Sequence, residues 1–535
     1  MFKKGIILIG LIAINATQAA NTLTVGSDDQ CGYPTIQAAL SFAAPGDFIS
    51  VAEGIIIGLD AQVEINKSII LTGGLDSTCQ VFTINHTSLQ SDLAGAVISV
   101  DVSGGANVEI NGFDISGSQA DAFNPFTSGI AISGDGTVTI DNTLIHDNKS
   151  ALGGGISAIN GSVLFLQNNT EIYANEASSK GGGIYCLDCT LFATDIKIGK
   201  FDNNQELGNT VTNMDGLGGG IYMENAPTSF LGKSPNGTGV VTVSYNSSIE
   251  AAGIYLKDSS LISNHPSNIF SYNQADNLAA VATLEGNSFF NIVNGKILNN
   301  SGSNIFTTID TSELIIESDN DGCHLEICAE ISNNIAVSSL FRIQGQANVT
   351  IKRVKSDRNS NRFAFVNGSL NNGITVENSI ISNQEVAILH SLIKVVGSLS
   401  PLAKFTNVTV VNNSGAVIFD PSVSAKLIFD GGIISGNTAA ALSELTNIDN
   451  LEVKNSVIQY DPTGLVNTVQ ADPLFVDLAN DNYYLQFTSP AIDYFTGTTT
   501  EDILGVSRPQ GLSHDAGAYE WSDLIFANDF ELVIE

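Results

Sequence analysis

Basic residues are scarce in this chain. Lys and Arg together number 21, against 55 Asp and Glu, and the resulting formal net charge of −34 is spread along the sequence. A surface of this sign repels the phosphates of nucleic acids and of anionic lipids. The composition therefore argues against a nucleic-acid partner.

Long apolar runs are missing as well. The run from Gly5 to Ile14 is shorter than the ~20 residues that a membrane-spanning helix needs, and no later run qualifies. Lys3 and Lys4 precede this run and small residues follow it up to Ala20, which is the order found in secretory signal peptides. We predict that residues 1–20 are a signal peptide. The mature chain is then secreted, or held at the cell surface of a Gram-negative bacterium, without a membrane-spanning segment.

The motifs of several enzyme classes are absent. The chain has no Gly-x-Ser-x-Gly elbow, phosphate-binding loop or dinucleotide fingerprint, and its six histidines do not fall at metal-ligand spacing. No catalytic, cofactor-binding or metal-ligating residue is predicted from motifs. A non-enzymatic role is therefore favoured.

Cysteine is rare, but its six copies form an even set in a chain expected to be exported, where disulfides are the default. The spacing Cys186-Leu-Asp-Cys189 also occurs in redox and zinc half-sites, but no second ligand pair stands at zinc-finger spacing. Sequence alone leaves other pairings open. The expected pairs are Cys186 with Cys189, Cys323 with Cys328, and Cys31 with Cys79.

A short pattern of aliphatic and β-branched residues followed by Asn returns along most of the chain, with a period of about 24 to 30 residues. Its Asn positions include Asn148, Asn175, Asn273, Asn299, Asn383, Asn412 and Asn437. A second marker, Gly-Gly-Gly-Ile, occurs at 153–156, 181–184 and 218–221, with a degenerate copy at 251–254. The apolar runs are short and poor in helix formers, so each repeat is predicted to contain strands rather than helices.

Strands that recur at this period can stack in parallel so that each coil covers its neighbour. We therefore expect an all-β fold, a right-handed single-stranded parallel β-helix of about sixteen coils, roughly 75 Å long at the ~4.8 Å spacing between strands. Glycine supplies corners with positive φ, and the repeated Asn side chains bond to one another in a ladder. Gly and Asn are structural in this interpretation.

The predicted organisation has five parts. Residues 1–20 are the signal peptide, 21–60 an N-terminal cap with the first coil, 61–460 the β-helix, 461–521 a C-terminal capping module and 522–535 a tail. In the N-terminal cap, a short helix after Pro34 places Ile36, Ala39, Leu40 and Ala43 on one face.

Two segments of the body resemble known families. The segment from Thr35 to Val51 resembles the capping helix and first strand of the pectin-lyase-like superfamily, which implies the β-helix fold and is silent on activity. The alternation of Gly-Gly-Gly-Ile with Ile-x-x-Asn between about 130 and 280 resembles the passenger repeats of polymorphic outer membrane proteins. That resemblance implies a surface adhesin.

The far end carries a third resemblance. The motifs at 472–477, 489–493, 508–509 and 515–520 resemble the C-terminal module of secreted β-helix proteins called the choice-of-anchor Q type, with Ala516 as a small departure. The segment 525–531 resembles a terminal motif of exported Gram-negative proteins, with Asp529 where Gly is usual. Both resemblances imply export.

One basic cluster stands out, with Lys352, Arg353, Lys355, Arg358 and Arg362 supplying five of the 21 basic residues. We expect a solvated face or salt bridges to acidic neighbours. In the alternative, strand alternation places Arg353, Lys355 and Asp357 on one outward face, in a groove for a uronate.

Calcium is a further alternative, because the loops 202–204 and 317–321 are rich in oxygen ligands. No other cofactor is expected.

Two functions follow from the sequence. The leading hypothesis is a noncatalytic, adhesin-like monomer that binds a host or neighbouring cell surface or a polysaccharide. The alternative is a polysaccharide lyase or glycoside hydrolase, with Arg353, Lys355, Asp357 and Arg358 as the residues to test.

Overall fold

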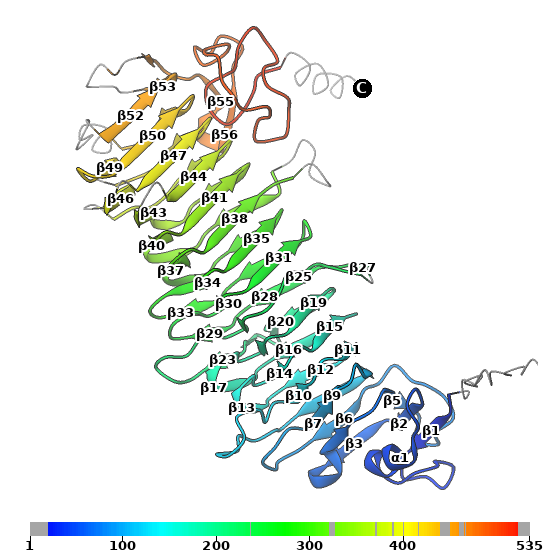
Figure 1. The fold of residues 1–535 in the computed structure, drawn as a ribbon. Coiled ribbons are helices and arrows are strands. Elements are labelled where there is room, and N and C mark those ends of the chain that lie inside the picture. The colour runs from blue at the N-terminus through cyan, green and yellow to red at the C-terminus, as the bar shows by residue number, and fades with distance from the viewer. Residues whose placement is uncertain are drawn as a thin grey trace, which may run out of the picture.

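The chain winds into a long parallel β-helix. The computed structural model describes residues 20–235, 237–319, 327–369, 372–387, 390–399, 401–415, 417–438, 450–459, 465 and 467–522. Three parallel sheets, here called A, B and C, run side by side along the molecule, with α1 at one end and β55 and β56 near the other (Figure 1). The predicted all-β solenoid is confirmed.

Sheet A is sixteen strands deep, as the repeat count predicted. Its strands are β1 (Thr22–Val25), β2 (Phe48–Ala52), β5 (Ile69–Leu75), β8 (Asn107–Asn111), β11 (Thr137–Asp141), β15 (Val163–Gln167), β19 (Thr190–Ala193), β25 (Ser229–Leu231), β31 (Ser260–Asn264), β35 (Phe289–Val293), β38 (Glu313–Glu317), β41 (Asn348–Lys352), β44 (Gly373–Glu377), β47 (Leu402–Thr406), β50 (Lys426–Asp430) and β52 (Leu451–Lys454).

Sheet B also has sixteen strands. They are β3 (Gly54–Ile57), β6 (Thr87–Gln90), β9 (Phe113–Ser116), β12 (Leu144–His146), β16 (Thr170–Tyr173), β20 (Ile196–Ile198), β28 (Val241–Ser244), β32 (Ile269–Ser271), β36 (Lys296–Leu298), β39 (Ala329–Ser332), β42 (Val354–Asp357), β45 (Ile380–Ser382), β48 (Thr409–Val411), β51 (Ile433–Ser435), β53 (Ser456–Ile458) and β54 (Thr468–Gln470).

Sheet C is divided in its first half and continuous in its second. One column holds β4 (Val63–Ile65), β7 (Ile98–Asp101), β10 (Ile130–Ser133), β14 (Ile156–Ile159), β18 (Ile184–Leu187), β24 (Ile221–Glu224), β30 (Ile254–Lys257) and β34 (Ala279–Glu285). A second column holds β13 (Lys149–Leu152), β17 (Glu176–Lys180), β23 (Thr210–Val211), β29 (Ser247–Ser248) and β33 (Gln274–Ala275). The columns merge into β37 (Ser301–Thr308), β40 (Ile335–Gly345), β43 (Ser360–Ser369), β46 (Ser391–Leu399) and β49 (Val417–Pro421) because β37 pairs with both β33 and β34.

Side-chain alternation builds the core. In β11, Val138 and Ile140 are fully buried and point inward, whereas Thr139 between them points outward. Val138 lies opposite Leu164 of the next coil, so each apolar residue packs on the equivalent residue above and below. One continuous apolar cluster therefore runs from Leu23 to Ile458.

The Asn ladder exists, but some of its members differ from the prediction. From Asn148 to Asn359, each amide nitrogen donates to the Oδ1 of the next Asn at 2.9 to 3.1 Å. Asn299, Asn383 and Asn412, which were predicted to be ladder residues, instead occupy the left-handed turn position with φ of 56°, 50° and 55°. The inward side chains there are those of the following residues, Asn300, Gln384 and Asn413. The turn has two polar positions in succession, and only the second points inward.

The N-terminal cap contains α1 (Ile36–Phe42), whose N-terminus is capped by the Thr35 hydroxyl. Ile36, Ala39 and Leu40 are buried on the predicted face, and the helix packs against β1, β2 and β4. A 3₁₀ turn, Gly58–Ala61, follows β3. No helix among the described residues is long and apolar enough to cross a membrane.

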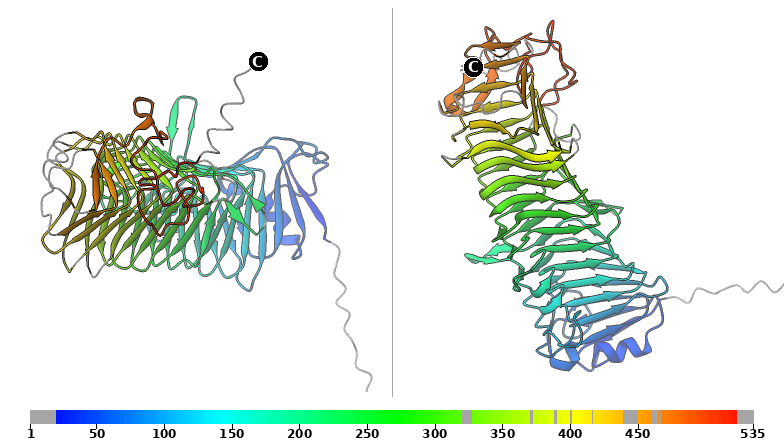
Figure 2. Two further views of the ribbon diagram at one scale, coloured as in Figure 1. Left: turned by 90° about the horizontal axis from the view of Figure 1, so that it is seen from above. Right: turned by 60° about the vertical axis from the view of Figure 1, so that its left-hand side comes forward.

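Three two-stranded hairpins project from or follow the stack (Figure 2). They are β21 (Lys200–Asp202) with β22 (Gln205–Leu207), β26 (Lys233–Ser234) with β27 (Gly237–Thr238), and β55 (Phe475–Asp477) with β56 (Asn482–Leu485), the last joined by the 3₁₀ turn Leu478–Asn480.

Within the predicted C-terminal module, 461–521, residues 468–470 form β54 of sheet B. From here on the C-terminal module denotes residues 471–522, which pack on the outer face of sheet B over the last coils. Ile380, Val411, Ile433 and Val457 point outward there and form one cluster with module residues such as Tyr483. The equivalent outward column carries charged residues in earlier coils, for example Lys355 directly opposite Ile380. This change in the outward side chains of sheet B, from charged to apolar, marks where the module covers the β-helix.

Candidate functional site

The basic cluster of residues 352–362 is spread around one coil rather than gathered on one face. Lys352 ends β41 in sheet A, Lys355 lies in β42 of sheet B, and Arg362 lies in β43 of sheet C. Arg353 and Arg358 occupy the two turns between these strands, with φ of 57° and 50°. Strand alternation therefore does not relate Arg353 to Lys355 and Asp357, because Arg353 precedes the strand.

Arg353 is buried against the C-terminal module. Its side chain is 2% exposed, its Nε donates to the carbonyl oxygen of Ile503 at 3.2 Å, and its Nη1 lies 3.6 Å from a carboxylate oxygen of Glu501. Arg353 thereby joins the module to the coil that contains Arg353. In the alternative interpretation Arg353 would line an outward groove, but the module covers its side chain.

Arg358 and Asp357 serve the same junction. Arg358 pairs with Asp357 and with Asp481 of the module, and these carboxylates raise its pKa. Asp357 also accepts hydrogen bonds from Ser382 Oγ at 2.7 Å and Asn383 Nδ2 at 2.8 Å. The expectation of salt bridges is met, but one partner, Asp481, belongs to the module rather than to an adjacent coil.

Two of the expected disulfides are present, Cys31–Cys79 and Cys186–Cys189, with Cα–Cα distances of 5.4 Å each. The first ties the segment after β1 to the segment after β5. Cys328 is disulfide-bonded, whereas Cys323 lies outside the described residues. Cys186 and Cys189 are fully buried in the core, so their disulfide is a structural cross-link.

Neither oxygen-rich loop forms a metal site within the described residues, which contain no group of three or more His, Cys, Asp or Glu placed to hold an ion. Asn203 and Asn204 have φ of 49° and 62° and form the two-residue turn between β21 and β22. Two positive φ values in succession define a type I′ hairpin turn, which favours Asn. In the second loop, Asp319 exchanges hydrogen bonds with Asn294, and residues 320 and 321 lie outside the described residues.

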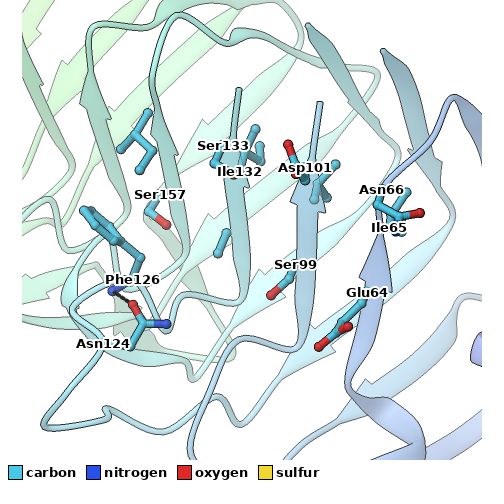
Figure 3. Close-up of a pocket in the computed structure, with 13 residues that line it drawn as sticks. Glu64, Ile65, Asn66, Ser99, Asp101, Asn124, Phe126, Ile132, Ser133 and Ser157 are labelled. Atoms are coloured by element: carbon cyan, nitrogen blue, oxygen red, sulfur yellow. Dashed lines mark hydrogen bonds between the residues drawn. The ribbon is translucent and has the colours of Figure 1, made fainter. Parts of the chain in front are cut away.

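Sequence motifs did not indicate the hollow on the outer face of sheet C. It has a volume of about 390 Å³ and lies across β4, β7, β10 and β14, beside the loop that precedes β10. Figure 3 shows Glu64 and Asn66 at one end, and Asn124 and Phe126 of the loop at the other. It is lined by Glu64, Ile65, Asn66, Ser99, Val100, Asp101, Asn124, Phe126, Ala131, Ile132, Ser133, Ser157 and Ile159.

The lining combines hydroxyl, amide and carboxylate groups with one aromatic ring, and it contains no basic residue. Glu64 and Asp101 are its two carboxylates, and they lie apart: Glu64 is opposite Ser99 on the neighbouring strand, whereas Asp101 lies two residues further along the strand of Ser99 (Figure 3). Hydrogen bonds from the Ser103 hydroxyl and amide lower the pKa of Asp101, so this carboxylate is an acceptor. The hollow therefore suits a neutral or weakly cationic ligand, to which it offers hydroxyl groups and hydrogen-bond acceptors.

Ser157 forms part of the floor and is 1% exposed. Its hydroxyl has no hydrogen-bond partner among the described residues. A buried hydroxyl without a partner carries a desolvation cost, which a ligand hydroxyl in the hollow would relieve.

Phe126 is held at the end of the hollow from two sides. Its backbone N–H donates to Asn124 Oδ1 at 3.0 Å, and its ring packs 6.1 Å from that of Tyr185. Tyr185, Tyr222 and Tyr255 then stack along sheet C at 5.4 Å intervals. The aromatic wall of the hollow is thus anchored to a buried column.

Two hydroxyls of this buried column are engaged with carboxylates, since Tyr255 donates to Glu285 and Tyr222 to Glu224. Tyr222 donates to Glu224 at 2.7 Å and accepts from Lys180 at 2.8 Å. Burial, followed by the charge of Glu224, raises the pKa of Tyr185 to about 12. These tyrosines are neutral and structural at ordinary pH.

The hollow continues toward the N-terminal cap. A second depression of about 530 Å³ shares Glu64, Ser99 and Asn124 with the first and extends to Thr35 and Gln37 near α1. The two form one elongated groove along the axis of the β-helix, which we call the sheet C groove. Phe123, 96% exposed, lies on the same loop as Asn124.

The Gly-Gly-Gly-Ile markers precede β14, β18 and β24 and build the corner of sheet C, but their glycines do not line the groove. Gly181 has a φ of 65°, and a Cβ on Gly183 would lie 2.6 Å from the carbonyl oxygen of Gly220 in the next coil. The glycines let the backbones approach closely at the corner between the two columns of sheet C. That corner separates the columns, and the groove lies on the outer face of the longer one.

No protein-family model matches this chain. No curated protein matches it in sequence either. A solved structure described as the crystal structure of pectate lyase Pel9A aligns over 94% of this chain and 97% of that chain, with 13% sequence identity and a TM-score of 0.27.

Proposed function

We propose that this chain is an exported, adhesin-like protein of the Gram-negative cell surface that binds glycans in the sheet C groove without cleaving them. The observation that carries the proposal is the lining of the groove: Phe126 at one end, the unpartnered Ser157 hydroxyl on the floor, and acceptors on both sides. Sugar rings present C–H groups on one face, which pack on aromatic rings, and hydroxyls at the edges.

The charge of the groove restricts the class of sugar that it can bind. Glu64 and Asp101 line it, no basic residue does, and the chain as a whole carries −34. Coulomb repulsion disfavours uronates and favours uncharged sugars. The resemblances of the central repeats and of segment 472–520 to surface proteins support the cellular location.

The alternative enzyme hypothesis loses Arg353, which is buried against the C-terminal module. Arg358 pairs with Asp481 of the module, but its side chain is 54% exposed, and it lines a hollow of about 600 Å³ together with Glu385 and Asp481. Arg358 is therefore the residue to test for the enzyme alternative.

The test is a glycan array with the purified mature chain, the Phe126→Ala variant and the matched control Phe165→Leu. Phe165 lies in β15 on the outer face of sheet A, stacked 4.9 Å from Phe192, and is remote from the groove. We expect binding to uncharged glycans, a loss of about tenfold or more in affinity for Phe126→Ala, since a stacked ring contributes roughly 1.4 kcal/mol, and no loss for Phe165→Leu.

Cleavage is followed on the same glycans, with and without Ca²⁺, through reducing ends and the absorbance of unsaturated products. Product accumulation would overturn the noncatalytic part of the proposal. Equal binding by Phe126→Ala and the wild type would overturn the assignment to the groove.

A further inference from the structure

Two tyrosines stand in a backbone conformation that suits them poorly. Tyr245 and Tyr272 occupy the left-handed turn between sheets B and C, with φ of 60° and 55°. Where other coils have a positive φ at this turn position, it is held by Asn, Asp or Gly, with two exceptions, Ala174 and Arg358; the others include Asp147, Gly199, Asn299, Asn333, Asn383, Asn412 and Gly436. Asn and Asp tolerate this conformation, whereas a bulky residue there is strained.

Burial does not compensate for the strain. Tyr272 is 47% exposed, and neither phenol hydroxyl makes a hydrogen bond among the described residues. The two rings stack with centroids 4.9 Å apart and planes 3° from parallel, and Phe201 of the hairpin β21–β22 stacks on Tyr245 at 5.8 Å. Phe201 is 55% exposed. We call Phe201, Tyr245 and Tyr272 the turn stack.

Arg358 occupies the equivalent turn position in a later coil. It also has a positive φ, and its side chain reaches Asp481 of the C-terminal module. In that coil the strained turn residue makes an ion pair outward from the coil. The rings of the turn stack contact one another, but each end of the stack leaves a ring face without a ring partner in the stack, and backbone strain of this kind clusters at functional sites.

From these observations we propose that the turn stack is a second glycan-binding site, separate from the sheet C groove, which takes an uncharged sugar residue against a free ring face. Phe201 and Tyr272 end the stack, so each has one face not covered by another ring of the stack. The exposed hairpin residues Asp202, Asn203, Asn204 and Gln205 beside Phe201 supply acceptors and donors for sugar hydroxyls.

The surroundings favour a sugar over a protein partner. A stable protein interface buries about 1,200–2,000 Å² around a dry apolar centre. Three rings flanked by polar hairpin residues offer a small and wet surface instead. The negative charge of Glu206 disfavours a uronate here as well; it contributes to the raised pKa of Tyr245 after burial and the neighbouring Tyr272.

The test uses the full mature chain and immobilised uncharged hexose oligosaccharides (cello-, malto- and manno-series), with polygalacturonate and tetramethylammonium as charged probes. The principal variant is the double substitution Tyr245→Asn with Tyr272→Asn. Because the equivalent residues of the flanking coils are Gly199 and Asn299, which tolerate a positive φ, we expect an unchanged or higher melting temperature together with at least a tenfold loss of affinity for the uncharged oligosaccharides. The conservative pair Tyr245→Phe with Tyr272→Phe keeps the rings and should keep most of the binding.

Phe126→Ala separates this proposal from the proposed function. Loss of binding in the Asn double variant but not in Phe126→Ala supports the turn stack and overturns the groove, and the reverse result overturns the turn stack alone. Additive losses support both sites. The turn-stack proposal is also overturned if the wild type binds none of the uncharged oligosaccharides, if it binds only tetramethylammonium, or if the Phe pair loses as much affinity as the Asn pair.

Discussion

Arg508 and Glu520 form an ion pair in which neither side chain is exposed to solvent, with Nη1 and Oε2 3.1 Å apart. Arg508 also donates to the carbonyl oxygens of Asp515 and Gly517, at 2.8 Å each. The guanidinium therefore holds together the last segment of the C-terminal module, and burial lowers its pKa against the raising effect of the nearby carboxylates.

Replacing Arg508 with Met should unfold the module early. Removing one partner of a buried pair leaves an uncompensated charge and costs roughly 3–5 kcal/mol. Trp521 is the only tryptophan of the chain, and its backbone N–H donates to Asp515, so its fluorescence during urea unfolding reports on the module. The control is Lys149→Met, which removes an exposed pair with Glu176 and should cost about 1 kcal/mol or less. Equal midpoints for both variants would contradict the assigned role of Arg508.

The module should be more stable at pH 5 than at pH 8. Burial, together with the charge of Glu520, raises the pKa of Asp515 to about 7 from 3.8, and burial raises the pKa values of Asp502 and Glu520 too. Between these limits the folded state binds more protons than the unfolded state, so the free energy of unfolding falls as the pH rises from about 4 to 7. Asp515→Asn, which keeps one acceptor oxygen, should flatten this dependence in the Trp521 unfolding curves. A module that gains stability between pH 5 and pH 8 would contradict the prediction.

Arg353→Ala should loosen the module without altering glycan binding. The substitution removes the hydrogen bond to Ile503 and the pairing with Glu501, both of which join the module to sheet B. We expect faster proteolysis within residues 471–522 and an unchanged glycan array. Loss of glycan binding with an intact module would instead restore the hypothesis that Arg353 contacts a polysaccharide.

His146 should titrate above its ordinary range. Its two ring nitrogens lie 2.8 Å from Asp114 and 2.6 Å from Asp147. Burial lowers the pKa of His146, but the hydrogen bonds and charges of the two carboxylates outweigh it, and the net shift is upward from 6.5. The stabilisation is complete below pH 6.5 and is lost as the pH rises through the folded pKa. Asp114→Asn should lower this pKa, as followed by NMR of histidine-labelled protein, whereas the exposed-residue variant Lys149→Met should leave it unchanged.

Asn246→Ala should destabilise the solenoid more than Asn299→Ala does. Asn246 is fully buried in the ladder and bonds to Asn209 and Asn273, so its loss leaves buried amide groups unpaired at about 1–3 kcal/mol. Asn299 only holds the left-handed turn, so its replacement should cost about 1 kcal/mol. Thermal unfolding measures both, and the opposite order would contradict the assignment of ladder and turn positions.

The sequence by itself determined the repeat, and with it the architecture. Short aliphatic runs with period-2 alternation can only bury one face by stacking on the next coil, and this local pattern predicted strands and sheets sixteen deep. The spacing of apolar residues after Pro34 predicted a capping helix that buries Ile36, Ala39 and Leu40, and the short spacing of Cys186 and Cys189 favoured their pairing. These features depend on residues that are close in sequence or repeated at a constant interval, whereas the pair Cys31–Cys79 was expected only by elimination.

Only the tertiary structure decided which side chains meet across coils and between the solenoid and the C-terminal module. The sequence pattern could not distinguish Asn299 from Asn300 as the ladder residue, because one residue of turn geometry separates an outward from an inward side chain. Arg353 meets Ile503 150 residues later, and Glu64, Ser99 and Ser157 meet in one groove through strand register. The proposed sheet C groove and the junction with the C-terminal module depend on these contacts between residues far apart in the sequence, which no local spacing encodes.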